Sequence, residues 1–259
     1  MGHFYDDPEF SYLDYWKTRN YEHESEIIAL RNLLGTQHFQ TALDLGGGFG
    51  RLASFLTSYA KQVLLVEPSL KQRNFAKTHL KGIKNIKILA GTCQKTKLAD
   101  QSCDLVVMIR VMHHLTEAGI VLDEIHRILK PNGIAIIEFA NSLNLKSRIM
   151  SFVSGKPILP APIDRRRAVN IRNQTIPFVN HHPVSLQKLL IKSGYKIDKL
   201  LSVSNFRGLP IKSLRIEKWL QKALSDFYFG PSIFVKVQRL DPSTSSGSMV
   251  SEIEPLTRP

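Results

Sequence analysis

The sequence predicts an α/β fold in which short buried strands alternate with helices. Three observations lead to this prediction. A glycine-rich turn, Asp44-Leu45-Gly46-Gly47-Gly48-Phe49-Gly50, lies between an apolar run and a helical pattern. Further short apolar runs follow, of the kind found in strands that are buried on both faces of a parallel sheet. Amphipathic stretches with helical spacing separate these runs, as in repeated strand–helix–strand units.

The composition is that of a globular protein with a sizeable core, since 43% of the 259 residues are hydrophobic. The apolar runs are too short to span a bilayer. An acidic, polar amino terminus is unlike a secretory signal. Cys93 and Cys103 lack the spacing and the histidine partners of a metal site. We therefore expect no metal, and two reduced thiols in a cytoplasmic protein.

The net charge of +13 is concentrated in the second half of the chain. Residues 1–140 carry 16 Lys and Arg against 15 Asp and Glu, whereas residues 141–240 carry 18 against 4. A basic face favours anionic partners, such as a phosphorylated or carboxylated substrate, RNA or a membrane surface. A solvated lysine-rich surface without a partner explains the scattered lysines of 188–222 equally well.

Residues 1–40 are expected to form a helical lead-in. Trp16 and Arg19 belong to a first helical pattern, and residues 26–34 form a second one. The segment precedes the first strand, so it can fold over a ligand cleft and act as a lid.

The glycine turn follows the first strand and opens a short helix with Leu52 and Leu56 on its apolar side. Gly46, Gly48 and Gly50 lack a Cβ atom, so a ligand can lie directly on backbone N–H groups. Asp44, at the strand end, can accept from a ligand ammonium or bind through water. The spacing is not that of a dinucleotide fingerprint, because Arg51 stands where its third glycine belongs. A nicotinamide dehydrogenase is therefore disfavoured.

The elements up to residue 140 keep the alternation. The expected strands are 63–67, 86–89, 103–109 and 134–139, and the expected helices between them are 70–80 and 117–129. Glu67 closes the second strand, where a carboxylate can accept from two ribose hydroxyls. Pro131 and Gly133 end the second of these helices.

The alternation breaks at residues 141–183, which contain Pro157, Pro160, Pro162, Pro177 and Pro183 and the triplet Arg165-Arg166-Arg167. A long connection of this kind is usually a lid or a binding segment. A helix at 184–193, a strand at 195–203, a helix at 209–224 and a strand at 232–237 follow. The apolar stripe of 209–224 is expected to pack against the sheet, although a membrane-surface role is an alternative. Residues 241–259 are expected to form a disordered tail.

The acidic-x-G-x-G-x-G pattern at 44–50 resembles motif I of the class I S-adenosylmethionine (SAM)-dependent methyltransferases. Four further blocks of the family follow in the right order within about residues 41–140, among them Met112-His113-His114-Leu115. The resemblance is to the small-molecule type, similar to the ubiquinone/menaquinone-biosynthesis group. It implies a Rossmann-like, mostly parallel sheet of seven strands in the order 3-2-1-4-5-7-6 with the last strand antiparallel. The SAM-binding domain would span 41–240, with 141–183 as a substrate-side insertion.

The resemblance also implies which residues bind SAM and which could act as a base. Thr92 stands where the family commonly has an aspartate for the adenine amino group, so backbone at Cys93 is expected to carry more of that contact. His113 and His114 are the candidates for a general base. The expected cofactor-binding residues are Asp44, Gly46, Gly47, Gly48, Gly50, Glu67, Pro68, Thr92, Cys93, Ile109, Arg110, Trp16 and Arg19.

The predicted function is transfer of a methyl group from SAM to a small, anionic or amphipathic acceptor by in-line displacement. RNA or protein methylation is the alternative within enzymes, suggested by the basic second half. A SAM-binding protein without catalysis is the alternative outside them.

Overall fold

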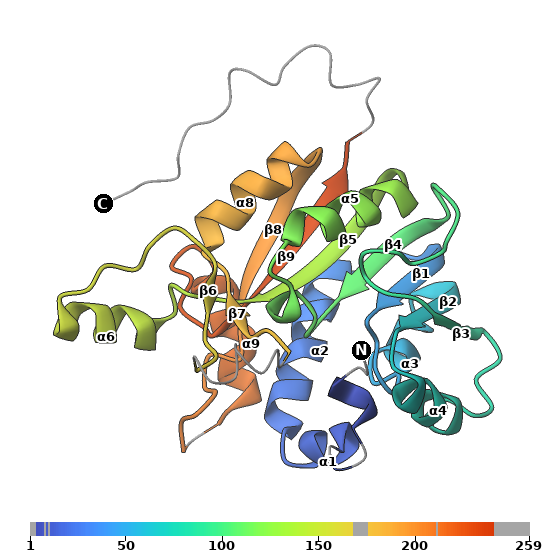
Figure 1. The fold of residues 1–259 in the computed structure, drawn as a ribbon, viewed down its shortest axis with the longest axis horizontal. Coiled ribbons are helices and arrows are strands. Elements are labelled where there is room, and N and C mark those ends of the chain that lie inside the picture. Colours follow the sequence, from blue (N-terminus) through green and yellow to red (C-terminus); the bar gives the residue numbers. More distant parts are fainter. Residues whose placement is uncertain (1–3, 8, 10, 168–175, 211, 241–259) are drawn as a thin grey trace.

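The computed structural model describes residues 4–7, 9, 11–167, 176–210 and 212–240 (Figure 1). Its centre is a seven-stranded sheet in the order β3-β2-β1-β4-β5-β9-β8. The strands are β1 (Phe39–Leu45), β2 (Ala60–Glu67), β3 (Ile86–Ala90), β4 (Cys103–Met108), β5 (Leu129–Ala140), β8 (Tyr195–Val203) and β9 (Ser232–Arg239). The first five pair in parallel, and β9 runs antiparallel to both of its neighbours. The predicted fold class and strand order are confirmed.

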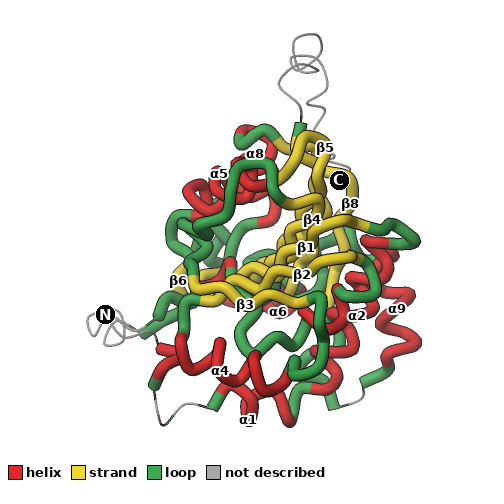
Figure 2. The backbone as a smooth tube through the Cα atoms, turned by 90° about the vertical axis from the view of Figure 1, so that its right-hand side faces the viewer, coloured by secondary structure: helices red, strands yellow, loops and turns green. Residues whose placement is uncertain are grey.

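Helices cover both faces of the sheet (Figures 1 and 2). One face carries α5 (Ala118–Ile128) and α8 (Pro183–Lys192), and the other carries α2 (Asn20–Leu34), α3 (Ala53–Leu56) and α4 (Leu70–His79). The other helical elements among the described residues are η1 (Phe4–Asp6), α1 (Tyr12–Lys17), η2 (Met112–His114), α6 (Leu145–Ser154) and α9 (Leu214–Ala223). A separate pair of short strands, β6 (Ile163–Asp164) and β7 (Val179–Asn180), lies outside the main sheet.

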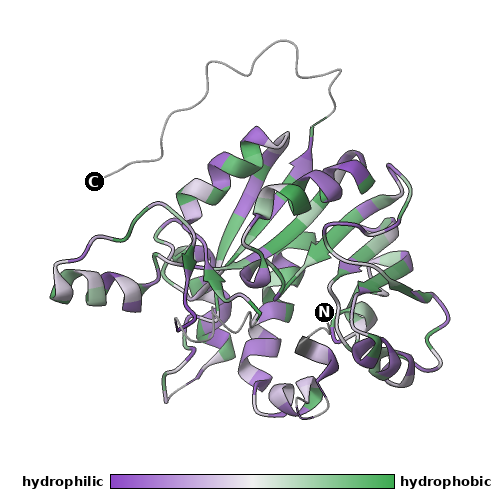
Figure 3. Ribbon diagram, in the orientation of Figure 1, coloured by the Kyte–Doolittle hydropathy of each residue, from purple (hydrophilic) through white to green (hydrophobic). Residues whose placement is uncertain are grey.

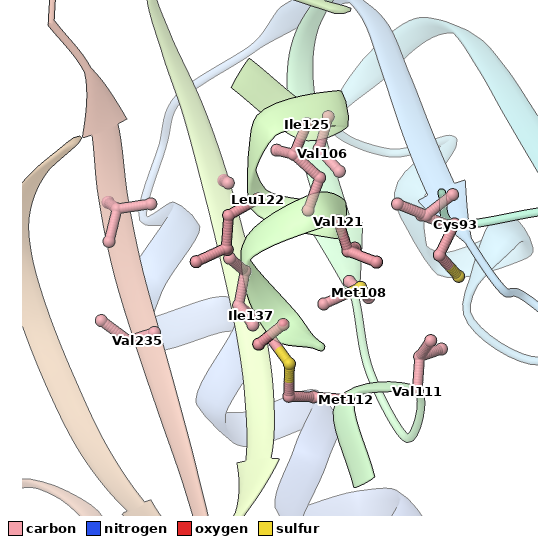
Figure 4. Packing of buried hydrophobic residues seen from close by; sticks show 14 of the residues in the cluster. Cys93, Val106, Met108, Val111, Met112, Val121, Leu122, Ile125, Ile137 and Val235 are labelled. Atoms are coloured by element: carbon pink, nitrogen blue, oxygen red, sulfur yellow. The ribbon is translucent and has the colours of Figure 1, made fainter. Parts of the chain in front are cut away.

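Side chains point alternately to the two faces along each strand, so the sheet contributes to two hydrophobic cores, one on each face. On β4, Val106 and Met108 pack with the α5 side, whereas Leu105 and Val107 pack with the side of α2, α3 and α4. Figure 4 shows Val106 and Met108 packed with Val121, Leu122 and Ile125 of α5. The strands are accordingly apolar on both faces, and the more hydrophilic colours lie mainly on the surrounding helices and loops (Figure 3).

Several element boundaries differ from the sequence-based expectation. Strand β5 begins at Leu129, so it includes Pro131 and Gly133, which were expected only to end the preceding helix, and the register against β4 shifts there. Helix α9 begins at Leu214, because Ser213 caps it by accepting from the backbone N–H of Ile216.

The expected long connection at 141–183 contains a helix that was not predicted. Asn144 caps α6 by accepting from the backbone N–H of Ser147, and Gly155 ends it with a left-handed φ of 65°. The expectation that the stripe of α9 packs on the sheet is wrong for Ile216 and Trp219, which are exposed. The tail predicted at 241–259 lies outside the described residues. No helix that the structure describes has both the length and the apolarity needed to cross a membrane.

Candidate functional site

The glycine turn presents bare backbone at the carboxyl end of β1. Gly46, Gly48 and Gly50 have φ of 74°, 56° and 86°, in the left-handed region that favours glycine. A Cβ atom on Gly46 would lie 2.5 Å from Cγ2 of Val111. The turn therefore requires glycine both for its backbone conformation and for the close approach of the loop after β4.

Gly46→Ala should lower the free energy of unfolding by about 1–3 kcal/mol, since it forces an L side chain into left-handed backbone and against Val111. The matched control is Gly119→Ala on α5, where a Cβ atom would meet nothing within 4 Å. That control should be neutral or slightly stabilising, because alanine is the better helix former. Thermal unfolding measures both, and equal melting temperatures would contradict the proposed strain.

Glu67 points from the end of β2 toward the glycine turn. Its Oε2 accepts from the backbone N–H of Gly48 at 3.0 Å, and its Oε1 accepts from that of Ser69 at 2.8 Å. Burial raises the pKa of Glu67, and these two hydrogen bonds partly offset the shift. The carboxylate is thus fixed beside the turn, with lone pairs remaining for a ligand.

A cavity of about 220 Å³ lies against this turn. Seven of the predicted cofactor-binding residues line it: Gly46, Gly48, Glu67, Pro68, Thr92, Cys93 and Arg110. Sequence reasoning missed other lining residues, among them Tyr5, Tyr12 and Gln72. The expected adenine contacts at Thr92 and Cys93 therefore face the same cavity as Glu67. Burial raises the pKa of the Cys93 thiol to about 12, so this residue stays protonated at neutral pH.

The other six predicted residues, Asp44, Gly47, Gly50, Ile109, Trp16 and Arg19, do not line the cavity. Asp44 lies beneath the turn, because a Cβ atom on Gly47 would come within 2.6 Å of its Oδ2. That oxygen is buried and has no hydrogen-bond partner among the described residues. Burial raises the pKa of Asp44 to about 7.

One lining residue, Arg110, belongs to a largely buried cluster of charges centred on Glu26 of α2. Its Oε2 pairs with Nη2 of Arg51 at 2.5 Å, and its Oε1 pairs with Nε of Arg110 at 2.7 Å. The guanidinium of Arg51 lies 3.8 Å from the ring centre of Trp16. Trp16 therefore supports the arginines of this cluster, whereas Arg19 stacks on Tyr15 at 4.1 Å.

Tyr5 and His114 form a hydrogen-bonded pair that lines the cavity. The carbonyl of Pro177 lies 2.9 Å from Nδ1 of His114 and can only accept, so Nδ1 carries the proton. The neutral ring then accepts at Nε2 from the Tyr5 hydroxyl at 2.7 Å. Burial lowers the pKa of His114 below its ordinary value of 6.5, which favours this neutral form at pH 7.

His113, the other predicted base, does not line the cavity. Its ring centre lies 4.0 Å from that of His114 and 5.3 Å from that of Phe178. Burial lowers the pKa of His113 well below 6.5, and the neighbouring His114 adds to the shift. Of the two histidines, only His114 faces the space where a ligand fits.

Comparison with known proteins places this geometry in a family. Residues 43–137 match the family model described as a methyltransferase domain. Residues 43–137 form a class I SAM-dependent methyltransferase domain. The domain is 31% identical over 94 residues to the ubiquinone/menaquinone biosynthesis C-methyltransferase UbiE of Rubrivivax gelatinosus, covering 36% of this chain and 37% of that protein.

A second relative of the methyltransferase domain is the ubiquinone biosynthesis O-methyltransferase of Bradyrhizobium diazoefficiens, at 30% identity over 119 residues. That alignment covers 45% of this chain and 46% of the relative. The chain thus aligns with less than half the length of these curated relatives.

Solved structures share the fold of the methyltransferase domain over most of the chain. A SAM-dependent methyltransferase from Mesorhizobium loti has a TM-score of 0.59 at 18% identity, covering 83% of this chain and 98% of its own. A chain from the complex of the Haloferax volcanii Trm112 methyltransferase activator with a methyltransferase has a TM-score of 0.65 at 13% identity. That match covers 93% of this chain and 100% of the other.

SAM is the cofactor of this family, and the site residues fit it. The glycine turn offers backbone N–H groups, Glu67 offers carboxylate lone pairs to ribose hydroxyls, and the buried Oδ2 of Asp44 lacks a partner among the described residues. In the described part of the chain, no group of three His, Cys, Asp or Glu residues is arranged to hold a metal ion.

Proposed function

We propose that this protein transfers the methyl group of SAM to a small, anionic or amphipathic acceptor. The observation that carries the proposal is that the glycine turn and Glu67 share one cavity with the Tyr5–His114 pair. Residues suited to bind the cofactor and a group suited to accept a proton therefore line the same cavity. A cytoplasmic location belongs to the same proposal, since Cys93 and Cys103 are both free thiols.

The amino-terminal segment 1–40 serves in this proposal as a cover of the cavity. Tyr5 and Tyr12 line it, and Asp6 accepts from the Ser69 hydroxyl at 2.6 Å and from the backbone N–H of Lys71 at 3.0 Å. These contacts attach the segment to the start of α4. The insertion 141–183 contributes Ile176 to the lining and the Pro177 carbonyl to His114, which supports its role on the substrate side.

When bound, SAM supplies a methyl group on a cationic sulfur, which an acceptor can take by direct displacement. The residues then have two tasks, to align the acceptor and to remove its proton. The Tyr5 oxygen receives the acceptor's proton as the Tyr5 hydroxyl passes its own to Nε2 of His114. The Pro177 carbonyl keeps Nδ1 protonated, so Nε2 remains the free base.

Tyr5→Phe and His114→Ala should each lower kcat by about 10²-fold or more, because each removes one member of the relay. SAM binding should change little. His113→Asn is the neighbouring control and should keep kcat near that of the parent protein. Unchanged turnover in His114→Ala would exclude this base.

The kcat of the parent should fall toward acid pH through a pKa below 6.5, as His114 becomes protonated.

Titration calorimetry with SAM and with S-adenosylhomocysteine tests the binding half of the proposal. Heat of binding with one site per chain is the expected result, and a flat trace with folded protein would refute it. Transfer of labelled methyl from SAM to a panel of small O–H, N–H and C–H acceptors tests the reaction. Labelling of RNA or protein alone would favour the alternative substrates, and binding without any turnover would favour a non-catalytic SAM-binding protein.

A further inference from the structure

Helix α6 turns its apolar side toward solvent. None of its ten residues is buried. Ile149, Phe152 and Val153 fall on one stripe at helical spacing, and Phe152 and Val153 are 90% and 74% exposed. Ser147 and Ser151, on the other side, are partly buried. This polarity is the reverse of that of a helix that packs on a core.

Helix α9 shows the same reversal. Its Glu217 and Gln221 are fully buried, and Glu217 accepts from the Tyr21 hydroxyl at 2.8 Å and from the backbone N–H of Ser204 at 2.8 Å. Trp219, in contrast, is 68% exposed. The polar face of α9 therefore holds the helix to the protein, and an aromatic side chain faces outward.

The start of α6 contacts the segment that follows α9. The backbone N–H of Leu145, at the start of α6, donates to the carbonyl of Phe229 at 3.0 Å. Arg148 donates through Nη2 to the carbonyl of Phe227, just beyond α9, at 2.6 Å. We call the outward side chains Ile149, Met150, Phe152, Val153, Trp219 and Phe227 the α6–α9 surface; all six are exposed. In Figure 1, α6 stands away from the sheet at the left edge of the molecule.

Basic residues surround the α6–α9 surface, and almost no exposed acidic residues lie among them. Exposed basic residues of the two helices and their flanks are Lys146, Arg148, Lys156, Lys212, Arg215, Lys218 and Lys222. Within residues 145–156 and 212–227, Asp226 is the sole exposed acidic residue. A surface that combines protruding apolar side chains with unbalanced positive charge attracts a partner that is negatively charged outside and apolar beneath.

We propose that the α6–α9 surface docks on an anionic lipid membrane. The apolar side chains enter the interface between headgroups and acyl chains, where Trp219 suits the boundary, and the lysines and arginines lie over lipid phosphates. RNA would use the cations but would leave Ile149, Phe152 and Val153 in water. The proposal does not depend on the methyl-transfer activity, because it concerns binding by a surface outside the cavity.

Vesicle flotation of the full chain tests the proposal, with phosphatidylcholine vesicles compared against mixtures with phosphatidylserine. Binding is expected to the anionic mixture and to weaken with salt. The double change Phe152→Ser and Val153→Ser should reduce the bound fraction about tenfold, and Trp219→Ser should reduce it also. Ile120→Ser removes an exposed apolar side chain from α5 and should leave binding unchanged.

Two lysine substitutions test the contribution of positive charge to membrane binding. Lys218→Glu, on α9, should weaken flotation, whereas Lys84→Glu, an exposed lysine before β3 at the far edge of the sheet, should have little effect. All the altered side chains are exposed, and a thermal melt checks that each variant folds.

Three results would overturn the proposal. The first is absence of flotation with anionic vesicles, or flotation that the Phe152/Val153 double variant retains in full. The second is a stable dimer in sedimentation velocity that this double variant dissolves, which would assign the surface to a second copy of the chain. The third is salt-sensitive retention of RNA that needs Lys218 but not Phe152.

Discussion

Glu67→Ala is expected to weaken SAM binding by about 100-fold. The change removes a carboxylate that can accept from two ribose hydroxyls, and hydrogen bonds to charged groups contribute about 1.5–3 kcal/mol each. It also leaves the backbone N–H groups of Gly48 and Ser69 without their acceptor, so the glycine turn loses a support. Titration calorimetry with SAM gives the change in Kd.

Glu67→Gln separates the two contributions of this carboxylate. The amide keeps the shape but has a single acceptor oxygen, so one of the two N–H groups at Gly48 and Ser69 would face another donor. We expect an intermediate loss of affinity. Asp123→Ala, an exposed carboxylate on α5, is the control and should bind SAM like the parent protein. Equal SAM affinity in Glu67→Ala and in the parent would refute the assignment of Glu67 to the cofactor.

Glu26→Ala should destabilise the fold by about 3–5 kcal/mol, because it leaves Arg51 and Arg110 buried without their shared counter-ion. In a protein of this size, the loss corresponds to a fall in Tm of about 10 °C. Glu24→Ala is the matched control, since Glu24 lies two residues away on the same helix and is exposed. Its effect should stay within about 0.5 kcal/mol.

The same carboxylate predicts a pH dependence of stability. Burial alone would raise the pKa of Glu26, but Arg51 and Arg110 outweigh it and hold the pKa below 4.5. A depressed folded-state pKa means that the stabilisation is present above pH 4.5 and is lost as the pH falls through the lowered value. The difference in Tm between the parent and Glu26→Gln should therefore shrink in acid. A difference that grows in acid would contradict the ion-pair account.

Much of the fold followed from local patterns. The strand runs at 63–67 and 103–109 are apolar on both faces because helices cover both faces of the sheet, and this burial is visible in the sequence. The glycine turn was recognisable because left-handed backbone selects glycine. Helix α6 was missed because the prolines that follow it, from Pro157 to Pro162, led to the interpretation of the whole stretch 141–183 as a connection.

The site was only partly predictable for a different reason. Glu67 and the turn are 19 residues apart and belong to one strand–helix–strand unit, so their meeting follows from the topology. Tyr5 and His114 are 109 residues apart, and Glu26 and Arg110 are 84 apart. Such pairs depend on how the amino-terminal segment lies on the sheet edge, and spacing along the chain carries no signal of it.

The sequence by itself determined the α/β class, the strand order through a family resemblance, and the glycine turn with its acidic partner at the end of the second strand. The tertiary structure alone decided that His114 rather than His113 faces the cavity, that Asp44 lies beneath the turn, and that α6 and α9 point apolar side chains outward. The physical reason is that backbone conformation and burial within one strand–helix–strand unit depend on the local sequence. The direction of a side chain depends instead on which distant segment packs against it.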